Sequence, residues 1–209
     1  EIYRQLKKLH PEGPPVIIDG GLHHPEYFSE EDINVTVIKT KSTSAAGPDG
    51  LSYRFMKQLS ISPSWNTALM FYINSLARGD LATPLRDYVG CARLVAIPKN
   101  QTTVRPIAIG NTLRRVLSAL TLRKNIEVIM NELGMRQLGT NVSCGVEAMY
   151  HLFEDAVSQV TDGESVFKAD FSNAFNNVSR QVLYDAIVAR YPSLKNYFTL
   201  CYALPITLY

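Results

Sequence analysis

The chain has 209 residues, of which 46% are hydrophobic and 19% are charged, and its formal net charge is +2. This length is enough to bury a core in one or two structural units, whereas the small net charge does not by itself indicate a nucleic-acid-binding protein. No apolar run is long enough to span a bilayer, and the first residues lack the core of a signal peptide, so we expect no membrane partner. The three cysteines are odd in number and widely spaced. They therefore favour reduced thiols in an intracellular protein of the nucleus or cytoplasm, with no disulfide-linked partner.

Residues 1–45 predict an irregular leader, because prolines interrupt it, although the run from Ser29 can start a short helical turn. Residues 51–59 predict a short helix. The Ser-Pro pair at 62–63 opens a stronger helix that runs through Leu76, and a glycine follows where a C-terminal cap belongs. The apolar side chains of this second helix are expected in the core: Leu69, Phe71, Tyr72, Ile73 and Leu76.

Two strand-like runs follow, at residues 91–97 and 104–109, joined by a short polar loop. Pro106 cannot donate a hydrogen bond to a ladder, so the second run is expected to be an edge strand. No acidic residue occurs between Asp87 and Glu127, a stretch that carries seven basic residues: Arg93, Lys99, Arg105, Arg114, Arg115, Arg123 and Lys124. A sector without acids suits the path of a polyanion, although a solvated surface with counter-charges elsewhere remains the alternative.

The second half of the chain predicts four more helices and one strand. Helices are expected to start at Asn111-Thr112, Ser143, Ser179 and Ser193, and the third of them ends at a Tyr-Pro pair. The strand runs into Asp170. Helices, a strand pair, further helices and a strand together indicate an α+β fold.

The strand before Asp170 carries the most informative pattern of the chain. Alternation places Val166, Lys168 and Asp170 on one face and Phe167, Ala169 and Phe171 on the other. An aspartate that closes a buried strand is costly unless a positive group, usually a metal ion, meets it. The alternative is an aspartate that caps a helix or forms a turn.

Three further segments accompany this pattern in a fixed order. Residues 45–52 read Ala-Ala-Gly-Pro-Asp-Gly-Leu-Ser, and the strand pair contains Arg-Leu-Val-Ala-Ile-Pro-Lys at 93–99 and Val-Arg-Pro-Ile-Ala-Ile at 104–109. Residues 137–151 contain Gln-Leu-Gly, then Gly-Val-Glu-Ala and a histidine. With the segment 166–175, these motifs resemble the reverse transcriptase domain of non-LTR retrotransposons, over about residues 40–209.

The resemblance implies helical fingers that carry a β-hairpin, followed by the start of a right-hand polymerase palm. We accordingly expect an irregular leader (1–45), fingers (46–160) and a partial palm (161–209). The implied activity is RNA-directed DNA polymerisation, in which two magnesium (or manganese) ions assist the attack of a primer 3′-hydroxyl on a dNTP. Asp170 and the backbone carbonyl of Phe171 would be metal ligands, with Asp170 catalytic.

The same resemblance assigns the remaining partners, which are an RNA template, a DNA primer and a dNTP. Lys99 and Arg105 would contact the triphosphate, Phe171 and Phe175 would also line the dNTP site, and the ring of Phe175 would exclude a ribose 2′-hydroxyl. Contacts with template or primer are expected from another set: Asp49, Arg114, Arg115, Gln137 and Lys168. Structural alternatives remain for most of them: a solvated lysine for Lys99, a core aromatic ring for Phe171 and Phe175, a solvent-facing side chain for Arg114 and Arg115, and pairing with an acid for Lys168.

Nothing after Asp170 resembles the paired-aspartate turn that supplies the other carboxylates of such enzymes, so we expect the chain alone to be inactive. One alternative is a non-catalytic remnant of a retroelement protein that binds nucleic acid. A phosphotransferase with an aspartyl nucleophile is disfavoured, because Ser172 stands where a second aspartate is usual. Group II intron maturases and RNA-dependent RNA polymerases share the palm, but Phe175 argues against the use of ribonucleotides.

Overall fold

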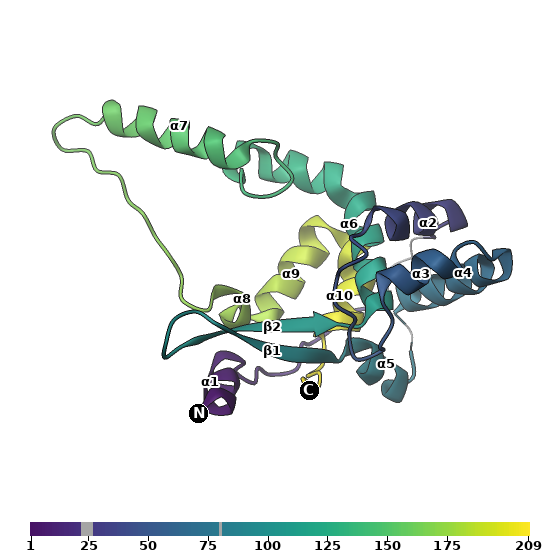
Figure 1. Ribbon diagram of the computed structural model, residues 1–209. Coiled ribbons are helices and arrows are strands. Elements are labelled where there is room, and N and C mark those ends of the chain that lie inside the picture. The colour runs from purple at the N-terminus through teal and green to yellow at the C-terminus, as the bar shows by residue number, and fades with distance from the viewer. Residues whose placement is uncertain (22–26, 80) are drawn as a thin grey trace. The chain divides into compact units, whose positions relative to one another are not determined.

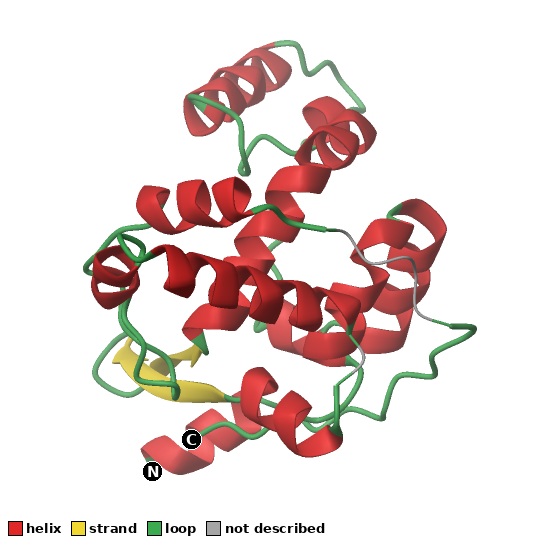
Figure 2. Ribbon diagram, turned by 90° about the vertical axis from the view of Figure 1, so that its right-hand side faces the viewer, coloured by secondary structure: helices red, strands yellow, loops and turns green. Residues whose placement is uncertain are grey.

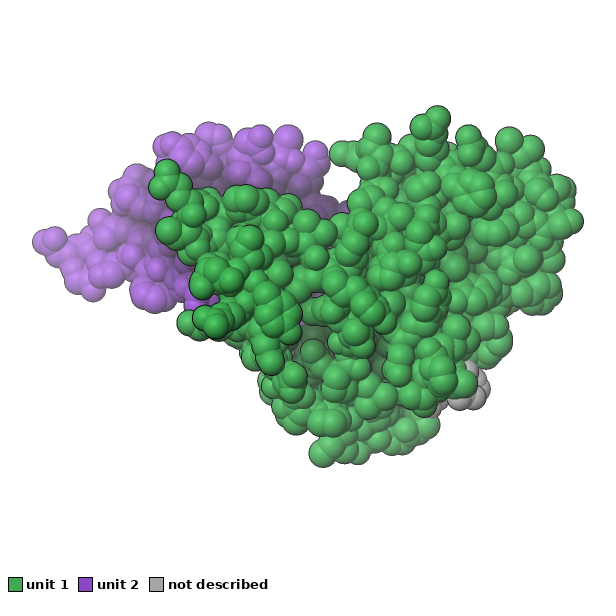
Figure 3. All heavy atoms as spheres, turned by 60° about the horizontal axis from the view of Figure 1, so that its bottom comes forward, with its two compact units in different colours: residues 1–125, 175–209 green, residues 126–174 purple. Residues whose placement is uncertain are grey.

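The computed structural model describes residues 1–21, 27–79 and 81–209. The chain forms two compact units, which comprise residues 1–125 with 175–209 and residues 126–174 (Figure 3). These borders differ from the three predicted segments, because residues 175–209 return to pack within the first unit. Helices make up most of the described residues, and the sheet that these residues form is one antiparallel hairpin (Figure 2). This confirms the α+β class.

The leader is more ordered than its prolines indicated. Residues Ile2–Leu9 form helix α1, where the prediction of an irregular segment is wrong. Glu30–Lys39 form α2, which starts after Ser29 as expected but is longer than a short helical turn; residues 22–26 lie outside the described residues. Helix α2 begins with a capping box, in which Ser29 Oγ accepts from Asp32 N (3.1 Å) and Asp32 Oδ2 accepts from Ser29 N (3.2 Å). These reciprocal bonds satisfy free backbone donors at the helix start. The Ser29 hydroxyl also donates to Asp32 Oδ2 (2.8 Å), and this bond, followed by the one from Ser29 N, lowers the pKa of the Asp32 carboxyl.

The next two predicted helices are confirmed. They are α3 (Tyr53–Leu59) and α4 (Pro63–Arg78), which lie beside α2 (Figure 1), and Gly79 ends α4 in the left-handed conformation with φ of 72°. A further helix, α5 (Thr83–Gly90), was not predicted. Phe71 was expected in the core and is 65% exposed, because it lies on the face of α4 opposite Leu69 and Ile73.

The main core of the first unit is built from helices that are far apart in the sequence. Buried side chains of α2, α3, α4, α6 and α10 pack together, and they include Ile33, Met56, Ile73, Leu117 and Leu200. Burying each of these side chains stabilises the fold by about 1.5–3 kcal/mol relative to exposure. A smaller cluster joins Val16 and Ala203 to Tyr184 and Phe198, whose rings lie 5.8 Å apart.

The predicted strand pair is confirmed as a hairpin of β1 (Ala92–Pro98) and β2 (Val104–Gly110). Leu94 N donates away from β2, to Tyr209 O (2.7 Å), so the even-numbered positions of β1 point their backbone groups outward. Pro106 lies opposite Ala96, one of these positions, and its missing N–H therefore costs the hairpin no hydrogen bond. β2 is an edge strand, as Pro106 predicted.

The remaining helices of the first unit follow the hairpin and the second unit. Helix α6 (Thr112–Leu133) begins directly after β2, and its residues up to Asn125 belong to the first unit. Helix α9 (Arg180–Arg190) starts at Ser179, whose Oγ accepts from Val182 N (3.4 Å). The short 3₁₀ helix Pro192–Leu194 leads into α10 (Lys195–Tyr202). The predicted helices from 111, 179 and 193 are thus confirmed.

The second unit contains the end of α6, a short 3₁₀ helix (Gly134–Arg136) and α7 (Gly145–Ser158), the helix predicted from Ser143. The predicted strand into Asp170 is wrong, since residues 164–171 form neither helix nor strand and are exposed. A strand persists only when a neighbour takes up its backbone hydrogen bonds, and no described residue pairs with this segment. Helix α8 (Ala174–Asn177) follows at the border of the two units.

No described apolar side chain of the second unit is buried. Along α7 the apolar positions recur at helical spacing but remain exposed by 46–66%: Val146, Met149, Tyr150, Leu152, Phe153 and Val157. The phenylalanines that follow are more exposed still, with Phe167 at 88% and Phe171 at 77%. The described side chains of this unit therefore form no hydrophobic core.

All three cysteines are free thiols, and burial raises the pKa of Cys201 to about 11. Among the described residues, none of the helices has both the length and the apolar character required to traverse a bilayer.

Candidate functional site

The turn of the hairpin is fixed by Asn100. Its Oδ1 accepts from the backbone N–H groups of Thr102 (3.0 Å) and Thr103 (2.8 Å), and Lys99 N donates to Thr103 O (2.9 Å). An asparagine that takes up the backbone donors of its own turn mimics a backbone hydrogen bond and restricts the loop. The backbone that carries Lys99 is therefore well defined.

Three cations share one face of this hairpin. Arg105 lies opposite Ile97, and alternation along β1 places Arg93 and, just past the strand end, Lys99 on the same side. Lys99 and Arg105 are exposed, and no hydrogen bond or ion pair within the described part of the chain engages their side chains. Arg93 donates through Nη2 to Ala46 O (3.1 Å). The two cations predicted to meet a triphosphate are thus brought to one face and left free.

Asp49 is engaged in the fold. Its Oδ2 accepts from Thr112 N (2.6 Å) at the start of α6, its Oδ1 accepts from Leu51 N (3.2 Å), and its own N–H donates to Asn111 Oδ1 (2.8 Å). A carboxylate at this position satisfies a free donor of the helix and interacts favourably with the helix dipole. The predicted contact of Asp49 with template or primer stays a prediction.

Gly47, in the same loop, touches the end of β2. A Cβ atom built on Gly47 would lie 2.4 Å from the carbonyl oxygen of Gly110 and 2.8 Å from Asn111 Cα. Real Cβ atoms do not approach backbone so closely, so the loop and the strand end can meet only with glycine here. This explains one glycine of the motif as a packing requirement.

Arg114 and Arg115 are half-buried on the first turn of α6 and line a groove of the first unit. Arg114 Nη1 donates to Gly90 O (2.7 Å), and Arg115 Nη1 donates to Ala45 O (2.7 Å). They are neither core residues nor simple solvent-facing arginines. They share the first unit with Lys99, Arg105 and Asp49.

The residues predicted around the catalytic motif are exposed and divided between the units. Lys168, Asp170 and Phe171 belong to the second unit, whereas Phe175, 98% exposed on α8, belongs to the first. Asp170 was expected at the end of a buried strand, and the absence of that strand removes the predicted surroundings of its carboxylate. No catalytic cluster is assembled around Asp170 among the described residues.

Gln137 lies in the loop between α6 and α7 and is exposed. Its Oε1 accepts from Gly139 N (2.9 Å), so the side chain closes a small turn within its own motif. A Cβ atom on Gly145 would lie 1.9 Å from Leu138 O, which explains why a glycine starts α7. The predicted template contact of Gln137 is left untested by this geometry.

Two magnesium ions in a nucleotidyl-transfer site need several carboxylate oxygens in one place. Among the described residues, no three histidine, cysteine, aspartate or glutamate side chains lie close enough to hold a metal ion together. The metal contacts predicted for Asp170 and the carbonyl of Phe171 stay predictions.

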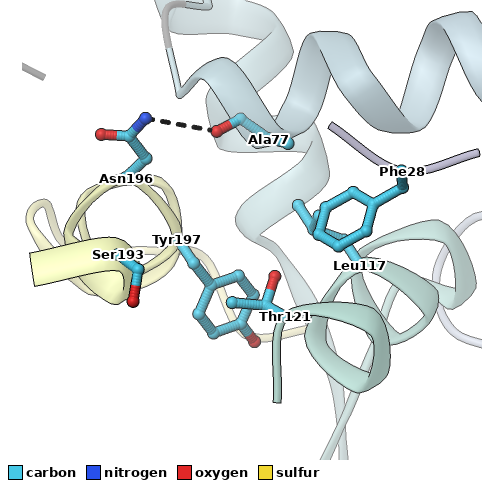
Figure 4. A pocket seen from close by; sticks show the side chains of 7 residues that line it. All are labelled: Phe28, Ala77, Leu117, Thr121, Ser193, Asn196 and Tyr197. Carbon is cyan, nitrogen blue, oxygen red and sulfur yellow. Dashed lines mark hydrogen bonds between the residues drawn. The ribbon is translucent and has the colours of Figure 1, made fainter. Parts of the chain in front are cut away.

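One small cavity lies between α4, α6 and α10 (Figure 4). Its volume of about 10 Å³ is at the lower limit for a single water molecule, which excludes a substrate there. Asn196 Nδ2 donates across its edge to Ala77 O (3.5 Å).

No family model, curated protein or solved structure matches the chain. The resemblance to reverse transcriptases therefore rests on the sequence motifs alone.

Sequence reasoning missed Tyr197 and Tyr202, which line the same groove as the two arginines. Residues five apart on a helix point about 140° apart, so no helical periodicity pairs these two tyrosines, and only the fold brings them to α6. It also missed Lys195, which is buried and donates to the carbonyls of Asp19 (2.7 Å) and Gly21 (2.8 Å). No local pattern marks a lysine that is satisfied by carbonyls about 175 residues earlier in the chain.

Proposed function

We propose that the chain carries the fingers and the first part of the palm of an RNA-directed DNA polymerase of the non-LTR retrotransposon kind. In this proposal the hairpin β1–β2 contacts the triphosphate of an incoming dNTP through Lys99 and Arg105. The observation that supports it is the exposure of both cations on one face of the hairpin, without a carboxylate partner among the described residues. An RNA template and a DNA primer are the other partners.

The two cations suit a triphosphate for different reasons. The lysine ammonium acts as a point charge, while the planar guanidinium can donate two parallel hydrogen bonds to phosphate oxygens. The fixed turn at Asn100 reduces the entropy lost when Lys99 binds. Phe175 and Phe171 are exposed and therefore accessible to a nucleotide, and we propose Phe175 as the ring that excludes a 2′-hydroxyl.

We do not propose that this chain alone is catalytic. One exposed carboxylate, Asp170, does not hold two magnesium or manganese ions, and no described side chains complete the set. We expect the 209-residue chain to extend no primer on an RNA template, and extension by it would contradict this interpretation.

The proposal is tested by the binding of a dNTP with a fluorescent label on its base, measured by anisotropy. Replacing both Lys99 and Arg105 with alanine should raise Kd at least about tenfold, because each charge-assisted hydrogen bond contributes about 1.5–3 kcal/mol. The corresponding dNMP should bind weakly to the wild-type chain, since it lacks the β- and γ-phosphates.

Lys39→Ala is the matched control, because Lys39 is an exposed lysine of α2 outside the hairpin. We expect it to leave dNTP binding unchanged. Equal dNTP affinity of the wild type and the Lys99→Ala/Arg105→Ala variant would contradict the proposed triphosphate contact.

A second candidate is a protein that binds single-stranded nucleic acid without chemistry. Phe167 and Phe171 favour it, because they are largely exposed on either side of Lys168, and bases stack on exposed aromatic rings beside cations. In this case Phe167→Ala and Phe171→Ala should weaken the binding of a short RNA, while the Lys99→Ala/Arg105→Ala variant should bind it nearly as the wild type does.

A further inference from the structure

A groove of about 500 Å³ in the first unit is lined by the segment at residues 44–45, the end of β2, α6 and α10. Figure 1 shows the arrowhead of β2 reaching the region where α6 and α10 meet. The polar side chains that line the groove are two arginines and four hydroxyl groups: Arg114, Arg115, Ser44, Ser118, Tyr197 and Tyr202. No acidic side chain lines it.

Arg114 is held in place by backbone. Its Nη1 donates to Gly90 O (2.7 Å), and its guanidinium lies so close to Gly110 that a Cβ there would be 2.4 Å from Nη2. Arg115 is held on the other side, where Nη1 donates to Ala45 O (2.7 Å) and Cζ lies 5.0 Å from the centroid of the Tyr53 ring. A guanidinium has five N–H donors, so most donors of both arginines remain for a ligand.

Neither arginine has a carboxylate partner in the described part of the chain. Asp49, the acid of the adjoining turn, directs its two oxygens to the backbone N–H groups of Thr112 and Leu51. Two half-buried cations on consecutive residues are unfavourable without a counter-charge, and an anion that reaches both relieves this cost. The first turn of a helix adds a partial positive charge in the same place.

The hydroxyl groups favour an oxyanion over a simple counter-ion. Burial raises the pKa of Tyr197 and of Tyr202, so both phenols remain protonated and able to donate at neutral pH. Ser44 and Ser118 are half-buried in the same groove. Guanidinium and hydroxyl donors that converge from several directions suit a tetrahedral anion, whose oxygens accept more bonds than a carboxylate does.

We propose that this groove binds a phosphate group through Arg114 and Arg115, either as a phosphodiester of a nucleic acid or as a free phosphate or nucleotide. The inference rests on this geometry and does not require Lys99 or Arg105 to bind a triphosphate. The buried residues of the core do not line the groove, although the Tyr53 ring beside Arg115 belongs to that core and Tyr197 packs against it.

The test is calorimetric titration with pyrophosphate at constant ionic strength, in the wild type and in the Lys99→Ala/Arg105→Ala background, which leaves the groove intact. We expect Arg115→Gln and Arg114→Gln to weaken the groove affinity at least tenfold, and Tyr202→Phe to weaken it two- to fivefold. Arg54→Gln, which neutralises an exposed arginine of α3, is the matched control and should change nothing.

If Arg114→Gln disturbs folding by circular dichroism, Arg115→Gln and Tyr202→Phe decide the result. Unchanged affinity in Arg115→Gln, or a chloride titration with the same heat, would overturn the proposal.

A short RNA distinguishes the two sources of the phosphate group. If the RNA competes with pyrophosphate in the wild type but not in Arg115→Gln, the ligand is a phosphodiester. If pyrophosphate binds and the RNA does not compete with it, the ligand is a free phosphate or nucleotide. Unchanged dNTP binding in the Lys99→Ala/Arg105→Ala variant would count against the hairpin proposal and not against the groove.

Discussion

Gly47 and Gly110 lie in backbone contact, and this contact joins the loop before α3 to the end of β2. A side chain at position 47 would overlap the Gly110 carbonyl, with Cβ 2.4 Å from that oxygen. The guanidinium of Arg114 packs against the same Gly110, where a Cβ atom would lie 2.4 Å from Nη2. Two glycines thus set both the approach of the loop and the position of an arginine in the groove.

Gly47→Ala is expected to lower the free energy of unfolding by about 1–3 kcal/mol, because backbone must shift to admit the methyl group. Gly13→Ala is the matched control, since nothing lies within 4 Å of its Cβ position, and we expect a change within about 0.5 kcal/mol. Urea unfolding followed by circular dichroism measures both. Equal stability of the two variants would contradict a close contact between Gly47 and Gly110.

Residue patterns predicted the hairpin that carries Lys99 and Arg105, and they failed for the strand before Asp170. Lys99 and Arg105 were found because alternating residues and a polar turn determine a hairpin locally. The placement of Asp170 required a partner strand, which no alternation within residues 166–170 can specify.

The start of α6 shows how one element depends on another. Asn111 and Thr112 were predicted to cap this helix locally, but the carboxylate that accepts from Thr112 N comes from Asp49, 63 residues earlier. The side chain of Asn111 instead accepts from Asp49 N and donates to Tyr88 O. Apolar periodicity predicted where the helix lies, whereas the donor–acceptor pairs at its start are long-range and were not predictable.

Asp49→Ala is expected to destabilise the first unit by about 0.5–2 kcal/mol, the usual effect of losing a side-chain acceptor at a helix start. Asp49→Asn keeps one acceptor oxygen and should cost less. Thermal unfolding of the two variants beside the wild type measures the difference. An Asp49→Ala variant with wild-type stability would contradict the capping role.

At the scale of the whole molecule, the first unit is discontinuous, because residues 1–125 and 175–209 share one core. Leu200 and Cys201 of α10 pack in the same cluster as Ile73 of α4 and Leu117 of α6. The predicted borders followed sequence order and separated these segments. Only the packing of side chains shows that they belong together.

Limited chymotrypsin digestion should cut first after Phe167 or Phe171, which are largely exposed in a segment without helix or strand. We expect the two products to remain associated in size-exclusion chromatography and to separate only in denaturing gels, because residues 175–209 stay packed in the first core. Phe167→Ala/Phe171→Ala should slow the first cut. Release of a free C-terminal fragment under native conditions, or a first cut in the hairpin, would refute this.

The discontinuous core also constrains synthesis on the ribosome. When Leu117 and Leu120 emerge, Leu200 and Cys201 of α10, which share their core cluster, have not yet been translated. At about 5–20 residues per second, the roughly 75 residues between Asn125 and Leu200 take about 4–15 s to be added. For that interval the nascent chain presents an open apolar surface, a target for chaperones until α10 arrives.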